Sequence, residues 1–473
     1  MKRIFLLLHL VFLAFTLGAH PWKSQYYVIV DTDCGLDDFR AICLLLSSPN
    51  VRILAITTSD GVIDATNGFY KVKSLLNEMH HEGILVGCNP DQAVKAGACP
   101  TAMGMEWGTP LLTDTELPGA AGIINYVLEN TRERITFISL GSLNTARLCT
   151  EKCPEFTARV LRILWSSSPD YKINNFNYNL DTISASGIIS GSVPLNLVYG
   201  DSLKRYDNVL ISSINLIHTK LAGKVMESLI TPETPYARAL FDELPVLFIH
   251  FPGLFQEKAS GGTDGYRLKD QGTGNDIITA FNHILAGDNV SRNQVLEEFP
   301  IDTVPYFDDI QVTMLTTLKK FGREEWVSTV IANELHRHLG VYAVIGVKMG
   351  IRAREYFGTG VDEMNVASYA GLTPPFSCMN DGLQVSTGAT LGHGLISVIS
   401  DTLRIPQADF NYMNRKIRLS LKPEIRTKVE SEIRELSKIY GLDSNIYWEL
   451  VRKAAIRYWA DFDRNEIFTI QVL

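Results

Sequence analysis

The chain has 473 residues and a formal net charge of −8, with 46% hydrophobic and 20% charged residues. Such a composition is typical of folded globular domains. Because a single core stops growing near roughly 250 to 300 residues, two domains are expected. Lys and Arg are not in excess, which excludes a surface built for a nucleic-acid polymer and favours a small-molecule substrate. The sequence leaves the oligomeric state open, a homo-oligomer included.

Residues 1–20 have the layout of a secretory signal peptide. Lys2 and Arg3 precede an apolar run from Ile4 to Leu17, and small residues follow before Pro21. The apolar run of about 14 residues is short for the roughly 20 that cross a bilayer, so cleavage is favoured over a membrane anchor. We therefore expect a secreted or periplasmic protein that has no transmembrane segment after cleavage.

Seven cysteines are spread along the chain. In an exported protein, Cys149 with Cys153, or Cys88 with Cys99, lie close enough in sequence to form disulfides, and ordinary buried thiols are the alternative. Seven are too few for a fold built on disulfides. The sequence does not decide between pairing and free thiols.

Short β-rich runs alternate with stretches of helical spacing up to about residue 310. This alternation predicts an α/β domain with a mostly parallel, doubly wound sheet, whose ligands bind beyond the carboxyl ends of the strands. The expected strands are Tyr26–Val30, Val51–Thr58, Ile84–Val86, Ile135–Leu140 and Pro194–Tyr199. The expected helices are Asp37–Ser48, Phe69–Met79 and Asn144–Leu148, and the strongly apolar Leu244–Phe251 extends the same region.

The character of the sequence changes beyond that point. Residues 323–357 read as long helical segments, and a stretch with Pro, Ser and Gly from Thr373 to Gly394 interrupts them. A charged amphipathic helix over Pro423–Tyr440 and a final strand are expected near the end of the chain. We place the boundary near residue 315, which gives domains of residues 24–312 and 318–473.

The segment Asp31–Asp38 places four carboxylates in eight residues, directly after an apolar strand and before a helix. Like charges this close raise one another's pKa, so such a cluster favours a bound cation, and oxygen-only ligands suit Ca²⁺ or Mg²⁺. Gly35 is expected to permit the tight turn. The alternative is that Asp37 and Asp38 only cap the helix.

This segment, Asp-Thr-Asp-Cys-Gly-Leu-Asp-Asp, resembles the N-terminal signature of the inosine-uridine nucleoside hydrolase family. The similarity covers roughly residues 26–310. The other similar positions are Thr136–Leu148 for the strand and Gly-Pro-Leu-Thr-Asn turn, Asn175-Phe176-Asn177 for the Glu-Phe-Asn ribose segment, Asp181 for the start of Asp-Pro-Glu-Ala-Ala, and Asp242 for His-Asp.

The resemblance implies calcium-dependent hydrolysis of the N-glycosidic bond of a ribonucleoside or related riboside. It implies a Ca²⁺ ion held by Asp33, Asp38, the backbone carbonyl of Leu140 and Asp242. Breaking an N-riboside leaves an oxocarbenium-like sugar, and a metal-held water beside a carboxylate supplies the nucleophile. The general base is expected to be Asp33.

The resemblance also implies which groups hold the sugar. Asp37 is expected on a ribose hydroxyl, Asn175 in the ribose segment and Asn177 on the 5′ side, while Asp31 supports the other carboxylates. Asn175 stands where the family has Glu. The substrate is therefore expected to be a small riboside whose identity the sequence does not fix.

The departures keep two other hypotheses open. Phe241 replaces the His that lies beside the departing base in some family members, so a catalytically impaired riboside-binding protein is the main alternative. An Asp-x-Asp after a strand also opens phosphatases of the haloacid dehalogenase type, but Gly35 stands where they have Thr. Release of free ribose distinguishes these hypotheses.

The second domain contains His336 and His338, and later Cys378 and Asp381, which would suit Zn²⁺ or another transition metal. Two His residues at i and i+2 diverge by about 200° on a helix, so both can reach one ion only at a helix start or in a turn. The alternative is one core His, one exposed His and a buried Cys.

Two segments shift that balance. Residues 336–340 and 378–392 resemble the family of proteins similar to the FmdE component of formylmethanofuran dehydrogenase, over about residues 323–473. The resemblance implies an α+β domain with a metal site near His336, His338, Cys378 and Asp381. Its task is not specified, because family kinship does not transfer function.

Overall fold

The structure is a computed structural model that describes residues 24–90, 99–111, 117–167, 175–200, 206–230, 238–258, 264–269, 273–287, 295–296, 299–399 and 404–473. The expected signal peptide, residues 1–20, lies outside the described residues. The chain divides into two compact units, Ser24–Val290 and Ser291–Leu473. Within the described part, no helix combines the length and the apolar character needed to cross a bilayer.

The first unit is built on an eight-stranded sheet whose order is β3-β2-β1-β4-β5-β6-β8-β7. Every neighbouring pair is parallel except β7 and β8, which are antiparallel. The strands are β1 Tyr26–Thr32, β2 Val51–Ser59, β3 Leu85–Asn89, β4 Ile135–Ser139, β5 Val160–Ser166, β6 Leu195–Tyr199, β7 Phe255–Glu257 and β8 Asp264–Leu268.

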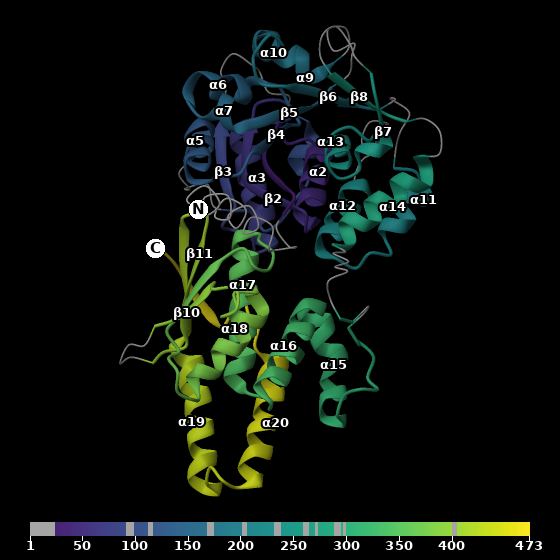
Figure 1. The fold of residues 1–473 in the computed structure, drawn as a ribbon. Coiled ribbons are helices and arrows are strands. Elements are labelled where there is room, and N and C mark those ends of the chain that lie inside the picture. The colour runs from purple at the N-terminus through teal and green to yellow at the C-terminus, as the bar shows by residue number, and fades with distance from the viewer. Residues whose placement is uncertain are drawn as a thin grey trace, which may run out of the picture. The chain divides into compact units, whose positions relative to one another are not determined.

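Helices cover both faces of this sheet (Figure 1). All nine residues of β2 are buried, as expected for a parallel strand covered on both sides. One group of packed helices contains α2, α12, α13 and α14, and another contains α5, α6 and α7. The helices are α2 Leu36–Ser47, α3 Ala65–Glu78, α4 Pro100–Gly104, α5 Ala120–Asn130, α6 Asn144–Lys152, α7 Phe156–Arg159, α9 Phe176–Leu180, α10 Thr182–Ile189, α11 Asn208–Ile214, α12 Lys220–Ile230, α13 Glu243–His250, the 3₁₀ turn Pro252–Leu254 and α14 Thr273–Ala286.

The predicted fold class is confirmed for this unit. Each strand expected from the sequence is present, with bounds that differ by one to three residues, and the three expected helices are also present. The apolar run Leu244–Phe251 is helical and forms most of α13, which lies against α2. Strand β5 was not anticipated, although it is largely buried and lies between β4 and β6.

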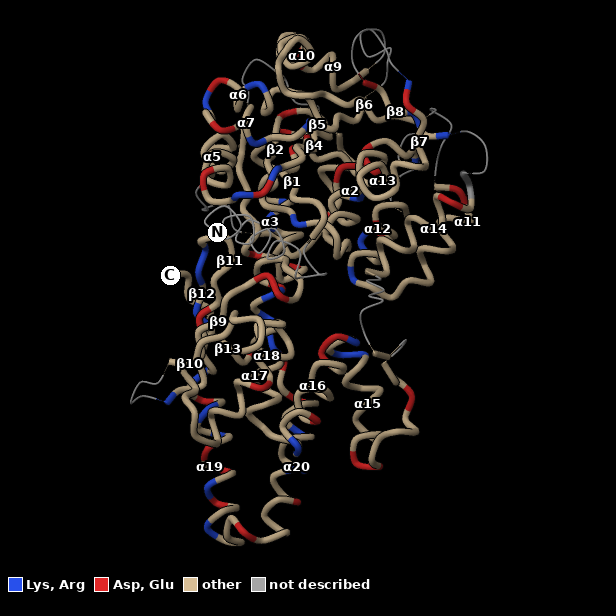
Figure 2. The backbone as a smooth tube through the Cα atoms, viewed as in Figure 1, with Lys and Arg blue, Asp and Glu red and all other residues tan. Residues whose placement is uncertain are grey.

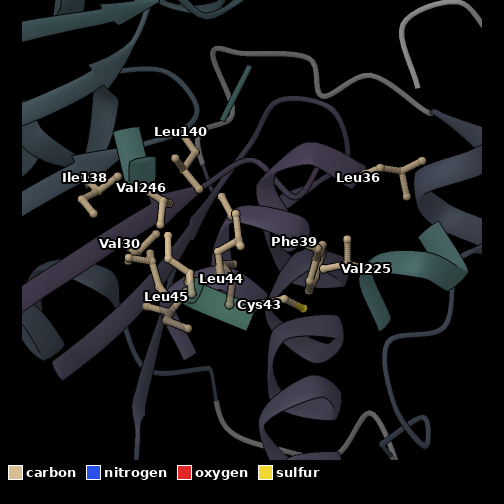
Figure 3. Close-up of a cluster of buried hydrophobic side chains, with 14 of the residues drawn as sticks. Val30, Leu36, Phe39, Cys43, Leu44, Leu45, Ile138, Leu140, Val225 and Val246 are labelled. Atoms are coloured by element: carbon tan, nitrogen blue, oxygen red, sulfur yellow. The ribbon is translucent and has the colours of Figure 1, made fainter. Parts of the chain in front are cut away.

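The core of the unit lies directly beneath the acidic segment. Figure 3 shows side chains from β1, β4, α2 and α13 packed together, among them Val30, Ile138, Leu44 and Val246, and these four are fully buried. The core thereby fixes the ends of β1 and α2 relative to the start of α13. Burial of such side chains stabilises the fold by roughly 1.5–3 kcal/mol each.

The second unit is an α+β domain, as predicted. Its five-stranded sheet has the order β10-β9-β11-β12-β13, in which only β10 and β9 are parallel. The amphipathic helix Pro423–Tyr440 is present as α19 with the expected bounds, and charges of both signs follow it along its length (Figure 2). The elements are α15 Asp308–Phe321, α16 Arg323–His336, α17 Val341–Phe357, β9 Asn365–Ser368, the 3₁₀ turn Phe376–Cys378, α18 Met379–Thr387, β10 Ile396–Val398, β11 Gln407–Tyr412, β12 Arg415–Leu421, α19 Pro423–Tyr440, α20 Asn445–Asp461 and β13 Phe468–Val472.

One expectation about the second unit was wrong. The stretch Thr373–Gly394 does not simply interrupt the helices, because it contains α18, which packs against α16 and α17. Its Gly382 lies against the backbone of α17, where an added Cβ would meet the carbonyl oxygen of Ala343 at 2.1 Å. Glycine in this stretch therefore serves close helix packing as well as turns. All seven cysteines of the chain are free thiols.

Candidate functional site

The acidic segment forms the loop from the end of β1 to the start of α2. The left-handed residue in this loop is Cys34, with φ of 67°, whereas Gly35 has φ of −65°, a value open to any residue. The expectation that Gly35 supplies a special turn conformation was therefore wrong. Its role is steric, because a Cβ there would lie 2.7 Å from Asp37 Oδ1 and 2.8 Å from Asp38 Oδ2.

Asp38 organises this loop. Its Oδ1 accepts from the Thr32 hydroxyl at 2.5 Å and from the Asp33 backbone N–H at 3.1 Å, while its Oδ2 accepts from the Gly35 N–H at 3.1 Å. The last of these bonds caps α2, so the capping alternative is correct for this residue as far as it goes. The same carboxyl group is also hydrogen-bonded to Asp33 and Asp242, so capping is only part of its role.

Carboxylates from two distant parts of the chain meet here. Oxygen atoms of Asp37, Asp38 and Asp242 all lie within 4.8 Å of one another. Among the residues that the structure describes, no other group of three His, Cys, Asp or Glu side chains is so compact. Asp242 immediately precedes α13, and the packing of α13 against α2 brings the two segments together.

Asp33 lies beside this group and contacts Asp38, but it is not a member of the compact trio. Its Oδ2 accepts from the Val62 backbone N–H at 3.3 Å. Two glycines enclose it, because an added Cβ would lie 2.2 Å from Asp33 Oδ2 at Gly61 and 2.9 Å from Asp33 Cβ at Gly141. The side chain of Asp33 is thereby confined between three chain segments.

The electrostatics of the group reflect burial and mutual repulsion. Burial, with the neighbouring Asp37, raises the pKa of Asp38 to about 6. Burial and the charges of Asp38 and Asp37 raise the pKa values of Asp33 and Asp242 well above their usual range. Protein groups thus leave the negative charge of the site poorly compensated.

The donor set fits a hard divalent cation. It consists of oxygen atoms only, and Asp33, Asp38 and Asp242 are each at most 5% exposed. Two carboxyl groups at hydrogen-bonding distance must share either a proton or a cation, and this applies to Asp38 with both of its neighbours. A cation at this position would relieve the repulsion that raises their pKa values.

The expected backbone ligand lies at the end of β4. The carbonyl oxygen of Leu140 accepts from the Asn177 side-chain amide at 2.6 Å, and the same amide lies 3.4 Å from the carbonyl of Ser166. Asn177 therefore holds the Leu140 carbonyl in place. The Oδ1 of Asn175 accepts from the Tyr178 N–H at 2.8 Å and caps α9, so this oxygen has a structural partner.

Asp31 supports the site from beneath, as expected. It is fully buried, accepts from the hydroxyls of Thr57 at 2.6 Å and Ser59 at 3.0 Å, and its pKa is raised to about 7, chiefly by burial. Sequence reasoning missed these two partners. The signal was present, because Thr57 and Ser59 alternate along β2, next to β1, and their side chains share one face of the sheet.

The position beside Asp242 is not a proton donor. Phe241 is 37% exposed, and only its backbone N–H makes a polar contact, donating to Glu243 Oε2 at 3.1 Å. Its ring cannot transfer a proton. The hydrogen-bonding partners of Asp242 include Ser166, a residue that sequence reasoning had not assigned to the site.

We expect Gly61→Ala to disturb Asp33 more than any other part of the site. A methyl group there would overlap the Asp33 carboxylate, so Asp33 has to move away from Asp38. A misplacement of about 1 Å costs on the order of 10²-fold in rate, and we expect kcat to fall by about that factor. Riboside turnover assays measure it, and Gly119→Ala, where the added Cβ meets no atom within 4 Å, is the matched control.

In the second unit, two of the expected metal ligands are adjacent. His336 is the last residue of α16, and Arg337, with φ of 67°, turns the chain so that the rings of His336 and His338 lie 4.2 Å apart. The Nδ1 atom of His336 lies 2.7 Å from Asp381 Oδ2, and its Nε2 atom is buried without a hydrogen-bonding partner among the described residues. Cys378 does not join these residues in a compact ligand group.

The chain was compared with known proteins. Residues 28–275 match the family model described as inosine-uridine preferring nucleoside hydrolase, and residues 335–457 match the model described as FmdE, molybdenum formylmethanofuran dehydrogenase operon. Uridine nucleosidase 1 of Arabidopsis thaliana is 22% identical over 276 residues, covering 52% of this chain and 82% of that protein.

Two further similarities agree in kind. Probable uridine nucleosidase 1 of Oryza sativa subsp. japonica is 25% identical over 158 residues, covering 31% of this chain and 48% of that protein. Among solved structures, the purine-preferring ribonucleoside hydrolase from Gardnerella vaginalis aligns with a TM-score of 0.45 and 13% identity, covering 55% of this chain and 99% of that chain.

Proposed function

Because the chain belongs to the inosine-uridine preferring nucleoside hydrolase family, we propose that its first unit hydrolyses ribonucleosides in a calcium-dependent reaction. The protein is a hydrolase acting on N-glycosyl compounds. The products are free base and ribose. The uridine nucleosidases among its relatives support a ribonucleoside as substrate.

The observation that carries the calcium proposal is the convergence of Asp37, Asp38 and Asp242 within 4.8 Å in a buried setting. We propose that Asp33, Asp38, Asp242 and the carbonyl of Leu140 hold the ion, with Asp37 near enough to contribute. Bound calcium would supply positive charge that offsets these carboxylates and makes a nearby water more acidic. Zinc is disfavoured because the donors are oxygen atoms only.

The residues of the chain then divide the chemistry. Asp33 accepts a proton from the attacking water, and its buried position beside Asp38 makes it a stronger base than an exposed carboxylate. Asp37, the most exposed of the trio, holds a ribose hydroxyl. Asn177 keeps the Leu140 carbonyl oriented and borders the 5′ side of the sugar.

Hydrolysis breaks the bond between the anomeric carbon and the base nitrogen and forms a bond to the water oxygen. The proton that water loses passes to Asp33, and the departing base takes up one proton from solvent. Phe241 cannot supply that proton, so bases that leave readily as anions are favoured substrates. This reasoning gives an expected order within a substrate panel.

The test is a panel of ribosides incubated with the wild type and with Asp33→Ala, with and without a chelator, in which free ribose is measured. We expect ribose from at least one ribonucleoside, loss of release on chelation, recovery with added Ca²⁺, and a fall of about 10²- to 10⁴-fold in Asp33→Ala. Release that is unaffected by chelation would contradict the calcium proposal. No ribose from any riboside that binds would instead favour the riboside-binding protein.

For the second unit we propose a transition-metal site at His336 and His338. An Nδ1–H that donates to Asp381 leaves the lone pair of His336 Nε2 available as a ligand, so Asp381 orients this ring instead of binding the ion itself. Zinc titration of the full chain and of His336→Ala tests it. Equal zinc affinity in both proteins would contradict the proposal.

A further inference from the structure

A buried ion pair lies immediately behind the carboxylate group of the first unit. Arg40 is on α2, two residues after Asp38, and Glu243 directly follows Asp242. Arg40 Nε donates to Glu243 Oε1 at 2.6 Å, and the two side chains are 1% and 0% exposed. Each partner of the pair thus adjoins one of the carboxylates that meet at the site.

The pair is part of a larger network that includes the backbone before Asp242. The Arg40 Nη2 atom lies 3.4 Å from the carbonyl oxygen of Ala239, and Glu243 Oε2 accepts from the Phe241 N–H at 3.1 Å. The Tyr206 hydroxyl donates to Glu243 Oε1 at 3.0 Å, and its ring lies under the Arg40 guanidinium at 5.0 Å. The segment 239–243 is therefore attached to α2 at several points.

The charges of the pair cancel, which separates two possible roles. A lone Arg40 could serve as a counter-charge for Asp37, but Glu243 lies equally close and opposes that effect. A neutral pair cannot replace the cation that the carboxylates need. Its directional hydrogen bonds can, however, fix the distance between the start of α2 and the start of α13.

We propose that Arg40 and Glu243 are positioning residues that hold Asp242 opposite Asp37 and Asp38 and thereby set the calcium affinity of the site. This inference rests on the proposed calcium-dependent function. Residues behind metal ligands commonly change metal affinity by about 10- to 100-fold when they are replaced. A fall of that size is expected without any change to a ligand.

The test is isothermal titration of Ca²⁺ into the full chain, combined with the thermal unfolding temperature of each metal-free protein. We expect Arg40→Met to weaken Ca²⁺ binding by about 10- to 100-fold. Arg40→Lys keeps the charge but cannot contact both Glu243 and Ala239, so we expect intermediate affinity. Graded recovery by Lys is not expected from a residue that contributes only to folding.

Loss of fold is controlled by two further proteins. Arg40→Met/Glu243→Leu replaces the pair by apolar side chains, which often restores stability, and we expect its affinity to stay low while its unfolding temperature recovers. Leu128→Ala creates a cavity in α5, away from the pair, and should lower stability without changing affinity.

The outcomes separate the two proposals. Wild-type Ca²⁺ affinity in Arg40→Met, or affinity in the double variant that recovers together with stability, would overturn the positioning role alone. Absence of calcium binding by the wild type would refute the proposed calcium site, and the positioning role with it.

Discussion

Asp38→Asn is expected to lower kcat/KM for a ribonucleoside by about 10³-fold, because several kcal/mol of charge stabilisation are lost with the metal and each 1.36 kcal/mol is tenfold in rate. Both oxygen atoms of Asp38 accept from N–H or O–H donors, namely Thr32, Asp33 and Gly35. An Asn side chain has only one acceptor atom, so its NH₂ group must face one of these donors. The loop and the metal ligands then shift together.

The measurement is steady-state release of ribose at saturating Ca²⁺. Asp64→Asn is the matched control, because Asp64 caps α3 through the Asn67 N–H at 2.9 Å and Asn caps helices about as well. We expect that control to retain wild-type activity. Activity of Asp38→Asn within threefold of the control would contradict the role assigned to Asp38.

Glu325→Gln is expected to destabilise the second unit by about 3–5 kcal/mol, the typical cost of removing one partner from a buried ion pair. Glu325 is fully buried and accepts from Lys348 at 2.5 Å and Arg464 at 3.0 Å. The neutral amide leaves Lys348 charged and buried against the ring of Phe321, which lies 3.7 Å from its Nζ atom. Arg464 retains Glu355, so the deficit falls on Lys348.

Urea denaturation followed by tryptophan fluorescence measures this loss, because Trp326 and Trp459 stack in this unit with ring centroids 4.6 Å apart. The neighbouring Glu324 pairs with Arg354 but is 55% exposed, so Glu324→Gln should cost less than about 1 kcal/mol. Equal effects of the two replacements would show that burial does not set the cost.

The sequence predicted the acidic segment and its partner Asp242 because parallel strands place their carboxyl ends at one edge of the sheet. It also predicted most strands of the first unit, whose apolar runs are distinct. Strand β5 was missed because Arg162 and Trp165 break its apolar character. The helical state of Leu244–Phe251 was not settled, because a short apolar run suits a buried strand or a buried helix equally.

The finer geometry of the site could not be predicted. Which carboxylates form the compact trio depends on rotamers and on the packing of α13 against α2, and neither is encoded in local spacing. The left-handed conformation belongs to Cys34 and not to its glycine neighbour, contrary to propensity. The pairing of Arg40 with Glu243 spans 203 residues and has no local signal.

The most direct test of the metal site is the number of Ca²⁺ ions bound per chain, measured by equilibrium dialysis for the wild type and for Asp242→Asn. Asp242 is the ligand that comes from the distant segment, so its replacement tests the convergence itself. We predict one ion per wild-type chain and less than a tenth of that occupancy in Asp242→Asn at the same free Ca²⁺ concentration, because a loss of 1.4 kcal/mol or more lowers affinity at least about tenfold. Full occupancy of Asp242→Asn would contradict a calcium site shared by the two segments.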